Sequence, residues 1–103
     1  MDLDSIAYHE GEYKALRDCS VNMATHALQY GTMVFGGVRG YYNEAKQNLF
    51  LFRLPEHFQR LHRSARIMQM QPPLTEQAMI DVALNLARRN EYRKNVYYRP
   101  CIY

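Results

Sequence analysis

The sequence predicts an α+β fold, in which an antiparallel sheet of four or five strands carries two helices packed on one face. Two observations predict it. Short runs of β-branched and aromatic residues lie near residues 6–13, 33–52 and 96–103. Two longer segments, 54–68 and 75–90, instead repeat apolar residues at helical spacing. At 103 residues, the chain is expected to form one small domain.

The N-terminal part of the chain predicts two small elements. Residues 6–13 are expected to form a hairpin with its turn at Gly11. Residues 25–30 are expected to form one helical turn, which Gly31 ends as a C-cap. A strand then follows over residues 33–42.

Three glycines interrupt the strand at 33–42, and glycine inside a strand often marks a bulge or a close approach of a ligand or of another backbone. Because side chains alternate along a strand, two faces are predicted: Phe35, Gly37 and Arg39 on one, and Val34, Gly36, Val38 and Gly40 on the other. The first face sets an aromatic ring, a gap and a guanidinium side by side. It suits a small anionic ligand with an apolar part. The alternative is a core strand with Arg39 in a structural ion pair.

The rest of the chain predicts a hairpin, two helices and a final strand. Residues 49–52 are expected to pair antiparallel with the strand at 33–42. Pro55 opens the first helix, whose apolar stripe is Leu54, Phe58, Leu61, Ala65 and Met68. Thr75 caps the second helix, which stops near Asn90. Residues 96–103 form a last apolar strand with no cap or polar tail, so we expect the chain to be cut from something longer.

Composition and residue spacing exclude several classes of protein. The net charge of +3 is too small to indicate nucleic-acid binding by itself. No apolar run approaches the ~20 residues of a membrane span, and the acidic N-terminus lacks the order of a signal peptide, so a cytoplasmic protein is expected. Cys19 and Cys101 are expected to be reduced. His57 and His62 lack the spacing of a metal pair, and no metal site is predicted.

Two further groups of residues carry chemistry. Arg60, Arg63 and Arg66 recur on the first helix, away from its apolar stripe. They form either a solvated face, a phosphate site or a weak nucleic-acid footprint. Tyr97 and Arg99 share a face of the last strand, as an ordinary cross-strand pair or as part of a carboxylate pocket.

Four segments together resemble the N-terminal small domain of branched-chain amino acid aminotransferases, which belong to the same fold group as D-amino acid aminotransferase. They are Thr-His-Ala-Leu-Gln-Tyr-Gly-Thr at 25–32, Val-Phe-Gly-Gly-Val-Arg-Gly at 34–40, Phe-Arg-Leu-Pro-Glu-His-Phe-Gln-Arg-Leu-His-Arg-Ser-Ala at 52–65 and Tyr-Tyr-Arg-Pro at 97–100. The resemblance covers nearly all of residues 1–103. It implies an enzyme that uses pyridoxal 5'-phosphate to transfer the amino group of leucine, isoleucine or valine to 2-oxoglutarate, giving glutamate.

The resemblance also implies a role for each matching residue. Arg60 matches the arginine that holds the cofactor phosphate. Phe35 and Gly37 match residues that line the pocket for the branched side chain, and Arg39 matches an arginine close to it. Tyr97 and Arg99 match the pair that receives the substrate carboxylate. Tyr30 matches a tyrosine that reaches the neighbouring subunit's site, so a homodimer or larger homo-oligomer is implied, with no nucleic-acid or membrane partner.

Two departures from the family pattern matter. Gly36 stands where many relatives carry Glu, which leaves the preferred branched-chain substrate open. The family's Schiff-base lysine lies beyond the Tyr-x-Arg-Pro strand, and Lys14, Lys46 and Lys94 do not stand in its place. No catalytic residue is therefore assigned in this chain, and we expect it to be inert alone.

Three alternative functions remain open. The chain could be a stand-alone domain that binds phosphate or carboxylate without catalysis. It could be a relative of D-amino acid aminotransferase or aminodeoxychorismate lyase. It could also be a basic interaction domain that uses Arg60, Arg63 and Arg66 on nucleic acid.

Overall fold

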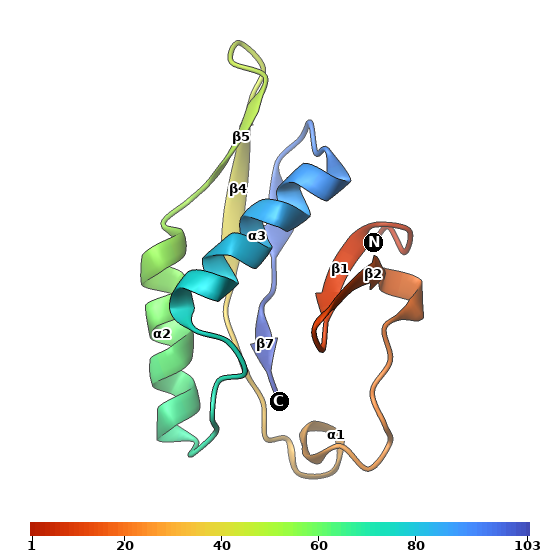
Figure 1. The fold of residues 1–103 in the computed structure, drawn as a ribbon, viewed down its shortest axis with the longest axis vertical. Helices are drawn as coiled ribbons and strands as arrows, with labels where there is room; N and C mark the ends of the chain where they lie inside the picture. Colours follow the sequence, from red (N-terminus) through yellow and green to blue (C-terminus); the bar gives the residue numbers. More distant parts are fainter.

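Two long helices and one short helix combine with seven short strands in the structure, a computed structural model that describes residues 1–103 (Figure 1). The elements are β1 (Ile6–His9), β2 (Glu12–Ala15), the 3-10 turn η1 (Leu16–Asp18), α1 (His26–Tyr30), β3 (Val34–Phe35), β4 (Val38–Asn43), β5 (Asn48–Leu51), α2 (Leu54–Ile67), α3 (Glu76–Asn90), β6 (Val96–Tyr98) and β7 (Cys101–Ile102).

The α+β class is confirmed, but the prediction of one sheet of four or five strands is wrong. The strands form three small antiparallel sheets, with the orders β1-β2, β3-β7 and β5-β4-β6. The strand predicted at 33–42 is divided into β3 and β4, and the strand predicted at 96–103 is divided into β6 and β7. Each half pairs in a different sheet.

Although each of these two strands is divided, the segments 34–40 and 96–102 stay aligned in one continuous antiparallel register. Val34 pairs with Ile102 in the smaller sheet, and Val38 pairs with Tyr98 in the larger sheet, so no residue is gained or lost between them. The amide of Gly36 donates to the carbonyl of Pro100 at 2.9 Å between the two ladders. Since Pro100 has no N–H, it cannot return a second bond, and the ladder breaks there. We call this continuous pair of strands the bent ribbon.

The buried face of the bent ribbon shares one core with both long helices. The expected stripe of α2 is buried at Leu54, Phe58, Leu61 and Ala65, whereas Met68 lies past the helix end and is 46% exposed. The core cluster joins this stripe to residues of α3 and of the ribbon, namely Met79, Ala83, Val34, Val38 and Ile102. The helices therefore leave the opposite face of the ribbon uncovered.

The predicted cap of α3, the predicted end of α1 and the predicted turn of the N-terminal hairpin are confirmed. The hydroxyl of Thr75 accepts a hydrogen bond from the Ala78 amide at 3.1 Å and caps α3. Gly31 ends α1 in the left-handed region at φ 69°, where glycine is unstrained. The hairpin of β1 and β2 turns at Glu10 and Gly11.

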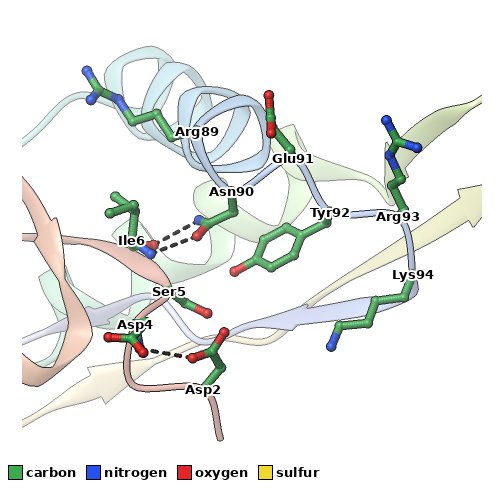
Figure 2. A pocket seen from close by; sticks show the side chains of 10 residues that line it. All are labelled: Asp2, Asp4, Ser5, Ile6, Arg89, Asn90, Glu91, Tyr92, Arg93 and Lys94. Atoms are coloured by element: carbon green, nitrogen blue, oxygen red, sulfur yellow. Dashed lines mark hydrogen bonds between the residues drawn. The ribbon is translucent and has the colours of Figure 1, made fainter.

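The N-terminal hairpin docks on the end of α3 through several side chains, with two hydrogen bonds from Asn90. The Asn90 side chain accepts from the Ile6 amide at 2.7 Å and donates to the Ile6 carbonyl at 2.9 Å, as Figure 2 shows. The guanidinium of Arg89 also stacks over the Tyr13 ring, 4.2 Å from its centroid. None of the helices is long and apolar enough to cross a membrane.

Candidate functional site

The bent ribbon keeps the predicted alternation of faces across its break. Val34, Gly36, Val38 and Gly40 are buried against the core, whereas Phe35 and Arg39 are exposed. Gly37, on the same face as Phe35 and Arg39, is partly covered. The exposed face thus carries the side chains in which the sequence placed a ligand pocket.

A cluster of aromatic and guanidinium groups forms on this open face. The Cζ atom of Arg99 lies 4.8 Å from the centroid of the Phe35 ring and 5.6 Å from that of the Tyr97 ring. The Cζ atom of Arg39 lies 6.0 Å from the same Tyr97 ring. These contacts join β3, β4, β6 and the Arg99–Pro100 segment. We call Phe35, Gly37, Arg39, Tyr97 and Arg99 the ribbon cluster.

The two arginines of the ribbon cluster form no ion pair. Each of the salt bridges in the structure involves other residues. The alternative in which Arg39 forms a structural ion pair is therefore wrong. Two guanidinium groups that share aromatic neighbours but no carboxylate keep their hydrogen-bond donors available for an external anion. The ribbon cluster can accordingly receive a carboxylate beside an apolar surface.

Gly37 contributes the space that its missing side chain leaves open. A Cβ atom added at this position would overlap the hydroxyl of Tyr97 and lie 2.7 Å from its Cζ atom. The ring of Tyr97 therefore occupies the place of the missing side chain. Although Tyr97 pairs in register with Arg39, its ring leans back along the ribbon toward Gly37.

One neighbour of the ribbon cluster was not singled out by the sequence. Cys101 pairs with Phe35 across the ribbon, and its thiol lies 3.6 Å from the Arg99 carbonyl oxygen. Partial burial raises the pKa of the Cys101 thiol, and the positive charge of Arg99 offsets part of that rise. The sequence predicted only that Cys101 is reduced, because only the pairing of distant strands places this residue beside the ribbon cluster.

Two predicted site residues lie outside the ribbon cluster. Arg60 is on the exposed side of α2, and its side chain makes no hydrogen bond, ion pair or cation–π contact. Tyr30 on α1 is 74% exposed, and its ring packs edge-on against His26 with 5.4 Å between centroids. No hydrogen bond, ion pair or aromatic contact joins either residue to the cluster within this chain.

The guanidinium of Arg60 has no ion-pair partner in the chain, and this decides whether the chain fits the phosphate of pyridoxal phosphate. The one ion pair within α2 and its cap joins Arg53 to Glu56, which leaves Arg60 without a competing carboxylate. An unpaired, exposed guanidinium fits a phosphate group. Each of the three lysines has other surroundings. Lys14 pairs with Glu12, Lys46 lies over the Phe50 ring, and Lys94 lines a separate cavity.

That separate cavity, of about 480 Å³, lies between the N-terminus and the end of α3 (Figure 2). It shares no residue with the ribbon cluster, and charged groups of both signs line it, among them Asp2, Asp4, Arg93 and Lys94. Its mixed charge gives no preference for a cofactor phosphate or a substrate carboxylate.

Comparison with known proteins identifies relatives of the whole chain, although no family model matches it. It is 37% identical over 102 residues to the branched-chain-amino-acid aminotransferase of Pseudomonas aeruginosa, an alignment that covers 99% of this chain and 32% of that protein. It is 35% identical over 99 residues to a probable branched-chain-amino-acid aminotransferase of Synechocystis, covering 95% and 32% respectively.

A solved structure agrees with these alignments. The branched-chain aminotransferase of the archaeon Thermoproteus uzoniensis, crystallised with norvaline, superposes with a TM-score of 0.86 at 33% identity, covering 91% of this chain and 31% of that one. This chain therefore spans about a third of the length of its relatives. It is homologous, over more than nine-tenths of its residues, to the N-terminal region of branched-chain amino acid aminotransferases.

Proposed function

We propose that residues 1–103 form the N-terminal small domain of a pyridoxal-phosphate-dependent aminotransferase. In the intact enzyme, the amino group of leucine, isoleucine or valine is transferred to 2-oxoglutarate. The observation that carries the proposal is the ribbon cluster, in which unpaired guanidinium groups border an aromatic surface on the uncovered face of a chain with this homology. A branched-chain amino acid needs both features, because it joins a carboxylate to an apolar branch.

The ribbon cluster divides into two roles. Arg99 and Tyr97 receive the substrate carboxylate, since a guanidinium fork and a phenol hydroxyl donate hydrogen bonds to its oxygens. Phe35 and Gly37 line the pocket for the apolar branch, and Arg39 lies beside them. A related branched-chain amino acid aminotransferase has been crystallised with N-(5'-phosphopyridoxyl)-L-glutamate and with 4-methylvaleric acid, which supports carboxylate ligands for this cluster.

Arg60 and Tyr30 act with groups from outside this chain. Arg60 holds the phosphate of the cofactor, which supplies the electron sink for the reaction when it is bound. The exposed ring of Tyr30 reaches the site of a second subunit, so the active form is a homodimer or larger. Lys14 pairs with Glu12, Lys46 lies over the Phe50 ring and Lys94 lines the separate cavity, so we assign this chain the binding and orientation of cofactor and substrate and no proton transfer.

A chimera tests the proposal. The N-terminal region of the Pseudomonas aeruginosa relative is replaced by this chain, and glutamate formation from leucine and 2-oxoglutarate is measured together with cofactor absorbance. We expect a chimera that is active, whereas the 103-residue chain alone shows no turnover. Transamination by the isolated chain, or a folded and cofactor-loaded chimera without leucine-dependent activity, would contradict the proposal.

A second arginine on the same helix provides a matched control for the role of Arg60 as phosphate anchor. Arg60 and Arg63 are both exposed on α2 and free of ion pairs. We expect Arg60→Gln to weaken the affinity of the chimera for pyridoxal phosphate by about ten-fold to a hundred-fold, and Arg63→Gln to leave it close to the unsubstituted value. Equal losses would indicate a general effect of positive charge on the helix and would remove Arg60 from the role of phosphate anchor.

A further inference from the structure

The ring of Tyr97 and the backbone of Gly37 are in direct contact. Tyr97 lies opposite Arg39 in the ladder, so Gly37 is its diagonal neighbour on the same face. A Cβ atom at Gly37 would stand 2.7 Å from Cζ and 3.0 Å from Cε2 of the ring, and would overlap the hydroxyl. Real Cβ atoms do not approach other heavy atoms this closely, so any side chain at position 37 must displace the ring.

The backbone does not by itself require glycine at this position. Gly37 is not among the residues with positive φ, so an L-amino acid could adopt its conformation. The adjacent Gly36 provides a contrast, because a Cβ there would lie 3.7 Å from Cγ of Pro100, an ordinary contact. The two glycines share the break in the ribbon, but only Gly37 excludes a side chain through Tyr97.

The position of the Tyr97 ring in turn determines its relation to the arginines. Arg39 and Arg99 both lie within cation–π range of this ring, at 6.0 and 5.6 Å from its centroid. A ring that rotated away from Gly37 would change both distances and would move the hydroxyl relative to both guanidinium groups. The space at Gly37 therefore sets the arrangement of three donor groups.

We propose that Gly37 is a positioning residue, whose missing side chain seats the Tyr97 ring across the ribbon and so fixes the phenol hydroxyl relative to Arg39 and Arg99. The functional part of this inference rests on the proposed function, in which Tyr97 and Arg99 receive the substrate carboxylate. The structural part, the seating of Tyr97 on Gly37, stands independently of it.

The structural part is tested on the 103-residue chain by NMR. We expect nuclear Overhauser contacts between the Gly37 α-protons and the Tyr97 ring protons. Gly37→Ala abolishes the ring contacts at this position, and Gly36→Ala retains them. Absence of the contacts in the unsubstituted chain would overturn the seating and would leave the proposed aminotransferase function unaffected.

The functional part is tested in the active chimera with a double-mutant cycle. Gly37→Ala is expected to raise KM for 2-oxoglutarate by about ten-fold to a hundred-fold, because misplaced donors lose binding steeply, while affinity for the cofactor is unchanged. Gly36→Ala leaves KM near the unsubstituted value.

The cycle is completed with Tyr97→Leu, which removes the hydroxyl and shortens the side chain. In that background, Gly37→Ala is expected to cause no further rise in KM, because the phenol ring with which the new Cβ would clash is absent. An equal effect of Gly37→Ala in both backgrounds would show that the glycine acts independently of Tyr97 and would refute the proposal. If Gly37→Ala alone does not fold, failure of the double variant to fold refutes it equally.

Discussion

The guanidinium of Arg99 lies over the ring of Phe35, with 4.8 Å between its Cζ atom and the ring centroid. Phe35 ends β3, and Arg99 follows β6 immediately before Pro100. The contact thus spans the break in the bent ribbon and links the two small sheets on their open face. No carboxylate pairs with Arg99, so its contacts with the Phe35 and Tyr97 rings are what hold its guanidinium on this face.

A first prediction concerns the shape of that cation. Arg99→Lys retains the positive charge but loses the planar fork and its stacking on Phe35, which are poorly replaced by an ammonium group. We expect KM of the active chimera for 2-oxoglutarate to rise about ten-fold or more. The control is Arg93→Lys, a change at an exposed residue outside the ribbon cluster. A KM that is the same with and without the Arg99→Lys substitution would show that only the charge is needed.

A second prediction concerns the docking of the N-terminal hairpin. Asn90→Ala removes the bonds of 2.7 and 2.9 Å to the Ile6 backbone and leaves both backbone groups without these partners. We expect a loss of about 2 kcal/mol in the free energy of unfolding, measured by urea denaturation, with faster hydrogen exchange at the Ile6 amide.

Asn95→Ala is the matched control for this change. The Asn95 side chain accepts a single bond, from the Tyr42 amide at 2.9 Å, and this pair is exposed to water. We therefore expect a smaller loss of stability and no change in exchange at Ile6. Similar losses for both asparagines would argue against the special contribution of Asn90.

The bent ribbon shows which features of the fold the sequence could predict and which it could not. Alternation along a strand correctly grouped Phe35 and Arg39 on one face, because the pleat continues through the ribbon break, and the structure shows that this face is the open one. The sequence did not predict the division into separate sheets, because that division depends on Pro100 lying opposite Gly36. These two residues are far apart in the chain, and the local residue pattern does not predict which residues of two distant strands pair.

The same limit applies to the candidate site. The sequence paired Tyr97 with Arg99 by their spacing, but the seat of Tyr97 on Gly37 arises from a diagonal contact between strands. Asn90 appeared only as a helix stop, although its side chain docks the hairpin. Contacts within one element follow from periodicity, whereas contacts between elements require the register and direction of both.

A third prediction follows from the hydroxyl of Tyr98, which is buried without a hydrogen-bond partner. Burial, and to a lesser extent the neighbouring Tyr92, raises the pKa of Tyr98 well above its ordinary value of 10.0. The folded chain therefore holds this proton at a pH where the unfolded chain loses it. Stability is unaffected below the unfolded pKa and falls as pH rises above it.

Tyr98→Phe removes both the orphaned hydroxyl and this titration. We expect the free energy of unfolding at neutral pH to stay level or to rise by about 1 kcal/mol. Urea midpoints measured between about pH 9 and pH 11 should fall less steeply than in the unsubstituted chain. Tyr41→Phe, at a ring that is 48% exposed, is the control and should retain the steep fall. A steep fall that persists in Tyr98→Phe would assign the alkaline loss to other groups.

The two threonines that precede helices give a fourth prediction with its own internal control. Thr75 caps α3 by accepting a hydrogen bond from the Ala78 amide at 3.1 Å, whereas Thr25 holds the same position before α1 without any side-chain bond. Replacing a capping threonine by alanine typically removes about 1 kcal/mol of stability. We expect that loss for Thr75→Ala and almost none for Thr25→Ala, both measured by urea denaturation. Because the two substitutions delete the same atoms, their difference isolates the capping bond, and equal losses would show that the bond at Thr75 does not stabilise α3.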